Sequence, residues 1–177
     1  MWKNFYGHFK TITTHKCKVM ALCFRCGLYK QGLLHDLSKY SFTEFIPGVR
    51  YYQGYRSPIS REKEVIGYSK GWLHHKGRNK HHFEYWIDSI HGKFQGVEME
   101  IPYVIEMFCD RVVASQVYAK ENYDDGYPLD YFMKNKDSYY LMHPNTMQLI
   151  ESLFVCLKEK GLDETIHYIR KEILKNQ

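Results

Sequence analysis

Apolar residues recur at spacings of three and four along almost the whole chain, and this periodicity limits the fold more than any other feature of the sequence. No stretch combines sustained polar and apolar alternation with hairpin turns, which would be typical of strands. The pattern therefore predicts an all-α fold. Its clearest stretch begins at Pro102, where one helix face is expected to enter the core. The apolar residues of that face are Val104, Ile105, Phe108, Val112 and Ala119.

Capping residues and helix breakers divide this periodicity into separate helices. Gly27 is expected to end the first helix, because glycine is favoured just past a helix end. Ser41 and Glu44 form a capping box, which opens a short helix that Pro47 and Gly48 disturb. The expected helices are about residues 8–26, 30–39, 41 onward, 60–75 capped by Ser60, 80–91 capped by Asn79, 102–121, 128 onward, 143–161 and 162–174, with His143 or Asp163 as caps of the last two.

The length and composition fit one globular domain. A chain of 177 residues can bury roughly 70% of the surface that its unfolded form exposes. The hydrophobic content of 44% and aromatic content of 16% exclude a disordered protein. The sequence contains no internal repeat and no linker between domains. One all-α domain over residues 1–177 is the economical interpretation.

The N-terminal sequence and the cysteines predict a cytoplasmic protein. The longest apolar run near the start, VMALCF, is too short for a signal peptide or a membrane span. The five cysteines are an odd number without a secretory context, so we expect reduced thiols and not disulfides. Cys23 and Cys26 form a single C-x-x-C within an expected helix. Without a second such pair, a zinc or redox role for it is disfavoured.

The charge of the chain is basic but modest. A net charge of +5 and a pI of 8.8 fall short of the asymmetry of a dedicated nucleic-acid binder. This excess serves solubility or attracts an anionic substrate. A nucleic-acid partner is disfavoured, and a homo-oligomer is left open.

Several histidines and acidic residues on the expected helices have metal-ligand chemistry. A mixed set of imidazoles and carboxylates suits zinc, iron, manganese, nickel or cobalt, whereas calcium takes oxygen ligands. Adjacent helical residues point about 100° apart, so a His-Asp doublet reaches one ion only from a helix end, or with ions on either side of it. The candidates are His15, the doublet His35-Asp36, the pairs His74-His75 and His81-His82, and Asp110.

The order His15, His35-Asp36, Asp110 resembles the HD-domain superfamily, an all-α fold of metal-dependent phosphohydrolases. The resemblance covers about residues 8–125, with helices of residues 126–177 packing on this metal-site core. It implies that His15, His35, Asp36 and Asp110 hold a first divalent transition metal. "HDLSK" is similar to the H-D-x-x-K motif of many members, which implies that Lys39 lies near a bound phosphate. "HDLSKYS", "HHKGRNKHHFEYW" and "EMFCDRVVAS" together look like a small bacterial or phage branch without an assigned activity.

Two-metal members of this superfamily add histidines between the doublet and the last aspartate, with the doublet aspartate bridging the ions. Here the two pairs stand at that place, although their spacing differs from that of the better-characterised branches. Because consecutive residues diverge, we expect one member of each pair to bind metal, and favour His75 and His82. His74 and His81 then become candidates for substrate contact or proton transfer.

The loop between the pairs carries three basic residues, Lys76, Arg78 and Lys80. They form either an ordinary solvated loop or a rim that attracts phosphate through charge-assisted hydrogen bonds. The leading hypothesis is a phosphohydrolase with one or two ions, which acts on a nucleotide or another small phosphate ester or diester. The alternatives are a di-iron oxygenase of the same fold and a non-enzymatic module that binds nucleotide or nucleic acid.

Overall fold

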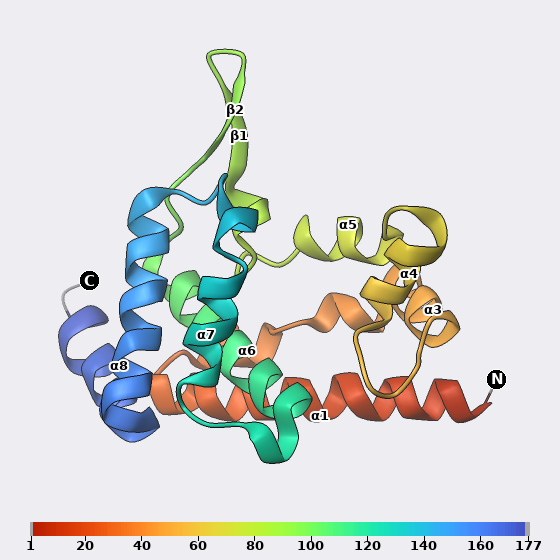
Figure 1. Ribbon diagram of the computed structural model, residues 1–177, viewed down its shortest axis with the longest axis horizontal. Helices are drawn as coiled ribbons and strands as arrows, with labels where there is room; N and C mark the ends of the chain where they lie inside the picture. Colours follow the sequence, from red (N-terminus) through yellow and green to blue (C-terminus); the bar gives the residue numbers. More distant parts are fainter. Residues whose placement is uncertain (1, 176–177) are drawn as a thin grey trace.

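The computed structural model describes residues 2–175, which fold mainly into helices around one long helix, α1 (Trp2–Cys26). Figure 1 shows α1 running along one side of the molecule, with α6 (Ile101–Ala119) packed against it. α6 in turn contacts α7 (Tyr127–Lys134) and α8 (Pro144–Tyr168), which ends in a π-helical turn, Ile169–Ile173. The predicted all-α class is confirmed, apart from one small hairpin.

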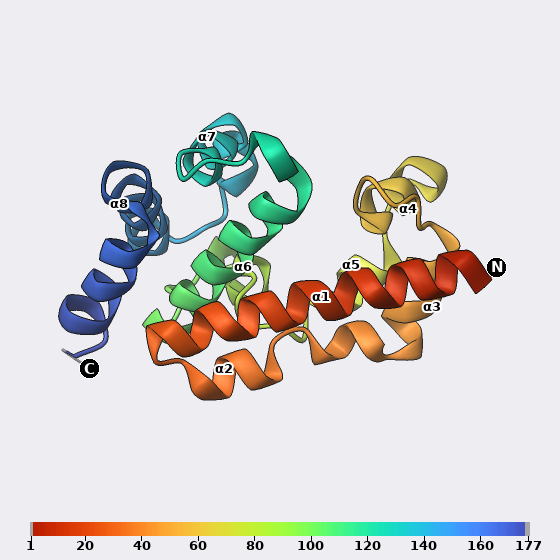
Figure 2. The same cartoon turned by 90° about the horizontal axis from the view of Figure 1, so that it is seen from below.

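Short helices follow α1 and form the other end of the molecule. α2 (Tyr29–Leu34) and α3 (Phe42–Arg50) run beside α1 in Figure 2, joined by a 3₁₀ turn, Leu37–Tyr40. α4 (Pro58–Ile66) and α5 (Lys70–Lys76) follow, and α5 packs on α3. Serine side chains cap both of these helices, so that the backbone N–H groups of their first turns have acceptors.

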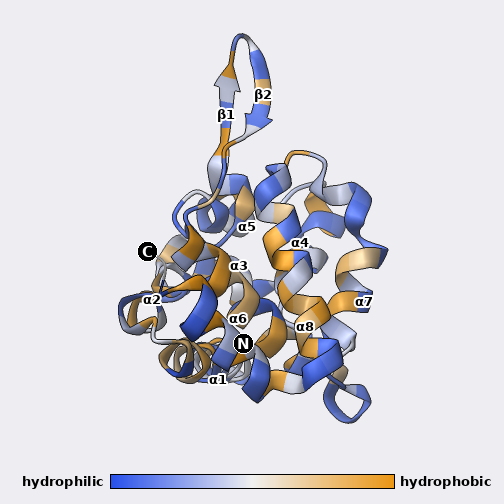
Figure 3. Ribbon diagram, turned by 90° about the vertical axis from the view of Figure 1, so that its left-hand side faces the viewer, coloured by the Kyte–Doolittle hydropathy of each residue, from blue (hydrophilic) through white to orange (hydrophobic). Residues whose placement is uncertain are grey.

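A β-hairpin replaces the helix predicted over residues 80–91. After a 3₁₀ turn, Phe83–Trp86, the strands β1 (Ile87–Ile90) and β2 (Lys93–Gly96) pair antiparallel, and Figure 3 shows them standing away from the helical body. The two-residue turn places His91 and Gly92 at positive φ, 50° and 76°. X-Gly is typical of such turns, and that signal was present in the sequence. Strands of four residues are too short to show alternation clearly.

Several predicted boundaries were also wrong. The expected helix 60–75 is two helices, because Gly67 adopts φ 83° and ends α4. α3 continues through Pro47, and its capping box does not form, because Ser41 makes no side-chain cap bond. α1 is already helical at Trp2, whereas α2 ends at Leu34. The last two expected helices form one element bent at Gly161, capped by His143. Asp163 instead forms an ion pair with Arg25.

The hydrophobic core lies between the second half of α1 and the helices α6, α7 and α8. Phe108, Phe132 and Phe154 are the largest of its almost fully buried side chains. Between Leu28 and Phe83, in contrast, no apolar side chain is fully buried, and the buried side chains are polar. They are His35, Asp36, Glu44, Glu62, Ser69, His75, Asn79 and His81. Within residues 2–175 no helix has the length and apolarity that crossing a membrane requires.

Candidate metal centre

The His35-Asp36 doublet lies where α2 ends and the 3₁₀ turn begins, and both residues are 1% exposed. Asp36 adopts a left-handed conformation, φ 55°. Aspartate tolerates this region better than most residues, and the backbone turns sharply there. The doublet therefore stands at a helix end, which is one of the two arrangements that let adjacent residues approach a common point.

One group of donor atoms surrounds the Oδ2 side of Asp36. His35 Nε2 lies 3.3 Å from Asp36 Oδ2 and 3.5 Å from Asp110 Oδ1. His15 Nε2 lies 2.8 Å from Asp110 Oδ1 and 3.9 Å from Asp36 Oδ2. The ligand atoms of these four residues all lie within 4.8 Å of one another. The structure thus brings together, from α1, α6 and the doublet, the four residues grouped by the HD-domain resemblance.

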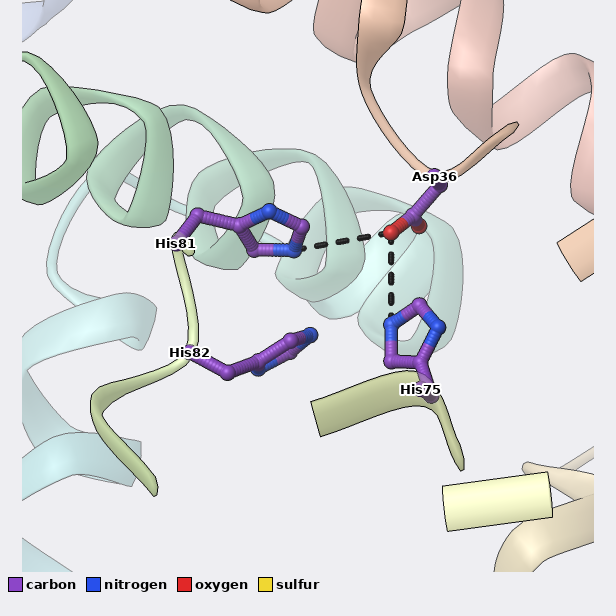
Figure 4. A group of neighbouring side chains, drawn as sticks. All are labelled: Asp36, His75, His81 and His82. Carbon is purple, nitrogen blue, oxygen red and sulfur yellow. Dashed lines mark ion pairs between the residues drawn. The ribbon is translucent and has the colours of Figure 1, made fainter. Parts of the chain in front are cut away.

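A second group faces the other oxygen of the same carboxylate. Nε2 of His75 lies 3.2 Å from Asp36 Oδ1, and Nε2 of His81 lies 3.5 Å from it (Figure 4). His82 completes this set, and all its ligand atoms lie within 4.8 Å of one another. We name the two groups donor set 1 (His15, His35, Asp36, Asp110) and donor set 2 (Asp36, His75, His81, His82). Asp36 is common to both.

The placement of the histidine pairs agrees only in part with the sequence prediction, because His75 and His82 lie in donor set 2 as favoured but His81 lies there too. Both members of the second pair belong to donor set 2, because His81 and His82 lie in the irregular connection between α5 and the next 3₁₀ turn, where neighbouring side chains need not diverge as in a helix. His74 does not join either set. Its Nδ1 lies 2.7 Å from Glu44 Oε1. The structure gives His81 the position of a ligand and His74 the position of a supporting residue.

Two glutamates that the sequence did not single out support the histidines from behind. Nδ1 of His35 and of His81 lie 2.8 and 3.1 Å from Glu106 Oε1. A carboxylate that accepts from Nδ1–H leaves Nε2 as the free acceptor, which is how metal-binding histidines are commonly oriented. Glu106 lies one turn before Asp110 on α6, and that i, i+4 spacing in an apolar helix was its signal.

Glu44 has the corresponding role for the first pair. Its Oε2 lies 2.8 Å from Nδ1 of His75, whose Nε2 faces Asp36. The sequence pattern assigned Glu44 to a capping box, but its side chain turns towards the histidines instead. Both glutamates are buried, and burial raises the pKa of each. Hydrogen bonds from the histidines more than offset this and lower the pKa below the usual value.

The electrostatic field keeps the acidic ligands charged. Burial raises the pKa of Asp36, but the charges of His35 and Lys39 hold it well below its usual range. Burial likewise raises the pKa of Asp110, and hydrogen bonds with His15 and His35 lower it further than burial raises it. Burial, followed by the charges of His81 and His75, lowers the pKa of His82 well below its usual value. Carboxylates and a neutral imidazole are the forms that bind a metal.

The unsatisfied atoms of the cluster fit a metal. Nε2 of His35, His81 and His82 and Oδ1 of Asp36 are buried without a hydrogen-bond partner. Buried polar atoms of proteins rarely lack a partner, because leaving one unpaired costs about 1–3 kcal/mol. Four such atoms converge here, each able to donate an electron pair to a cation. The nitrogen and oxygen donors suit a divalent transition metal.

Both donor sets border a cavity of about 230 Å³, the main cavity. His15 and Asp110 line it from donor set 1, and His75 and His82 from donor set 2. Lys39 also lines it, with Nζ 2.6 Å from Asp36 Oδ2. Burial lowers the pKa of Lys39, but the Asp36 carboxylate more than offsets this and raises it above the usual value. Most of the remaining wall is apolar.

The basic loop does not line this cavity. Arg78 and Lys80 line a second cavity of about 210 Å³, which is bordered by His81 and Glu106. Lys80 Nζ lies 5.2 Å from the ring centre of Tyr103, a contact typical of a cation and an aromatic face. Lys76 ends α5 and lines neither of the two cavities. His75, His81 and His82 lie around Asp36, whereas the basic residues of the loop do not form a rim around the main cavity.

These observations define a helical protein with a buried histidine and carboxylate cluster that could hold metal ions. The chain belongs to DUF5662, a family of unknown function, whose model matches residues 4–155. That range includes every residue of both donor sets and both supporting glutamates. No curated protein and no solved structure matches the chain.

Proposed function

We propose that this protein is a metal-dependent phosphohydrolase of the HD-domain type that acts on a small phosphate ester or diester. The observation that carries the proposal is the position of Asp36, whose two oxygens face two donor sets beside one cavity. A carboxylate shared in this way is suited to bridging two divalent ions. Three features support hydrolysis of a phosphate more directly than the chemical types of the ligands do. They are the shared Asp36, the adjacent Lys39 and the cavity.

Donor sets 1 and 2 would hold one ion each. Bound there, divalent ions would polarise the phosphate and lower the pKa of a bound water, so that hydroxide is available near neutral pH. Glu106 and Glu44 keep the histidine rings oriented with Nε2 towards Asp36. His82 lines the main cavity and is held neutral, which is the form of an imidazole that binds a metal.

Lys39 is the residue assigned to substrate charge. Its ammonium lies beside Asp36 and lines the main cavity, where it can neutralise charge that develops on phosphoryl oxygens. Among residues 2–175, no other lysine or arginine lines this cavity. The cavity is also smaller than the roughly 300–1,000 Å³ typical of pockets for drug-sized ligands, and therefore favours a small ester over a whole nucleotide.

The free thiols of all five cysteines fit a reducing, cytoplasmic setting.

The test is metal analysis of the purified protein followed by a screen of phosphate monoesters and diesters with manganese, iron, cobalt or nickel. We expect up to two ions per chain and release of phosphate. Asp36→Asn is expected to lose both, whereas His167→Asn, on the exposed face of α8, should change neither. Unchanged metal content in Asp36→Asn would contradict the site. Two bound irons that consume oxygen without cleaving any ester would favour the oxygenase, and salt-sensitive nucleotide binding without turnover would favour the binding module.

A further inference from the structure

The wall of the main cavity contains a carboxylate that has no role in the metal centre. Glu62, on α4, is 3% exposed and lines this cavity. Its Oε2 accepts a hydrogen bond from Ser69 Oγ. Within residues 2–175 it forms no ion pair with a lysine, arginine or histidine. Lys39, the lysine that lines the same cavity, is engaged by Asp36.

The bond to Ser69 does not explain the charge of Glu62. Ser69 caps α5, since its Oγ also accepts a hydrogen bond from the backbone N–H of Trp72. The oxygen of a neutral amide at position 62 could also accept the bond from Ser69. Acidic side chains are almost never fully buried unless they are paired, because an isolated buried charge is costly. A buried carboxylate that borders a cavity therefore points to a cationic partner inside that cavity.

The position of Glu62 relative to the donor sets limits the size of that partner. A Cβ added at Gly71 would lie 3.7 Å from Glu62 Oε2, so the carboxylate lies against this point of α5. His75 of donor set 2 follows Gly71 by four residues, or about 6 Å along the helix. Both ends of this span border the main cavity. The anion-binding and cation-binding ends of the site are therefore separated by about one helical turn.

We propose that Glu62 binds a protonated amine of the substrate, so that this site takes small phosphate esters that carry an ammonium group. This inference rests on the proposed hydrolase function. The phosphate would lie at the donor sets and Lys39, and the ammonium at Glu62. Trp72 follows Gly71 on α5 and also lines the cavity. Glu62 is thus a residue that determines specificity, separate from the metal ligands.

The test compares two esters that differ in the amine. Manganese-loaded protein is given phosphoethanolamine or ethyl phosphate, and released phosphate is measured. We expect kcat/KM to be about 10- to 100-fold higher for phosphoethanolamine, the range expected for one hydrogen-bonded charge pair. Glu62→Gln should remove most of this preference, mainly by raising KM for phosphoethanolamine. Ser69→Ala is the matched control, because it removes the hydrogen bond to Glu62 and keeps the charge, and it should keep the preference.

Each outcome decides between the proposals. Equal hydrolysis of the two esters by the wild type, or a preference that survives in Glu62→Gln, would overturn the role of Glu62 and leave the hydrolase intact. If the metal-loaded protein hydrolyses no ester of the wider screen, these two included, the hydrolase proposal fails, and calorimetric titration with the same two esters then tests Glu62 by affinity alone. Metal content and the thermal unfolding midpoint show whether Glu62→Gln is folded. If it is not, loss of the preference in Glu62→Asp, with a shortened carboxylate, replaces it as the test.

Discussion

The two ends of the molecule are stabilised by different kinds of buried side chain. Residues 29–82, the polar segment, bury histidines, acids, a serine and an asparagine but no apolar side chain. Residues 83–169, the apolar segment, bury mainly aliphatic and aromatic side chains, with Glu106, Ser115, Thr146 and Thr165 as the polar exceptions. Hydrophobic burial needs no ligand, whereas a buried cluster of imidazoles and carboxylates is expected to gain stability when it binds a cation. We therefore expect the apolar segment to act as a stable scaffold and the stability of the polar segment to depend on whether the proposed metal site is filled.

The largest effect is expected in the apolar segment. Phe154 is fully buried, with its ring centre 5.6 Å from that of Phe108 and 5.7 Å from that of Phe132. Phe154→Ala should lower the free energy of unfolding by about 3–5 kcal/mol, because it loses apolar burial and leaves a cavity. Chemical denaturation measures this with and without bound metal. Phe42→Ala, at an 83% exposed position, should change stability by no more than about 0.5 kcal/mol.

The loss caused by Phe154→Ala should be the same with metal and with a chelator, because Phe154 contacts neither donor set. A loss that doubles on metal removal would show that the two segments are not energetically separate.

Metal removal should affect mainly the polar segment. At a free metal concentration about 100 times Kd, binding stabilises the folded state by about 2.7 kcal/mol. Chelation should therefore speed amide hydrogen exchange in residues 29–82 and leave α8 largely protected. Mass spectrometry of peptides after exchange measures both segments in one experiment. Asp36→Asn should show the fast exchange even when metal is present.

Equal loss of protection in α8 and in the polar segment on chelation would contradict this difference between the segments, because it would mean that the whole chain unfolds as one unit without metal.

The supporting glutamates should differ in which ion they affect. Glu106 accepts from a histidine of each donor set, whereas Glu44 accepts from His75 of donor set 2 and from His74. Loss of such a partner typically weakens metal binding 10- to 100-fold. Glu106→Gln should therefore weaken the binding of both ions by about that factor. Glu44→Gln should weaken only the binding of the ion at donor set 2. Calorimetric titration with manganese resolves the two binding steps. Equal effects of the two variants on both ions would contradict the assignment of the supports.

Sequence periodicity predicted the scaffold well and the site only in part. The stripe from Val104 to Ala119 is buried as expected, because helix faces follow directly from residue spacing. Donor set 1 was grouped through the order of its residues along the chain. Glu106 and Glu44 were missed because a supporting carboxylate is recognised only when the helices that carry it are placed against the histidines.

Residue spacing could not identify which histidines of the two pairs face the metal site, for a related reason. His81 lies in donor set 2 because the backbone before the hairpin is irregular, and the sequence had predicted a helix there. The orientation of His74 depends on the position of Glu44 on α3, thirty residues earlier in the chain. Local patterns describe faces of single elements, whereas this centre is built from elements that meet only in the folded chain.

The smallest predicted effect concerns pH and the face of α1 that packs on the polar segment. Burial, together with the charge of Lys39, lowers the pKa of His8 to about 4. His8 is packed against Phe45 of α3, with ring centres 5.3 Å apart. The unfolded chain takes up this proton below about pH 6.5 and the folded chain only near pH 4, so stability falls with pH between these values. Allowing for solvent screening, the loss of unfolding free energy is about 1–2 kcal/mol.

Chemical denaturation in the presence of a chelator, at pH 7 and at pH 4.5, measures this loss. The loss should be smaller in His8→Gln than in the wild type, whereas His167→Gln, at an exposed position, should match the wild type. If His8→Gln loses as much stability in acid as the wild type, protonation of His8 does not cause the loss. The acid sensitivity would then be assigned to the residues around Asp36.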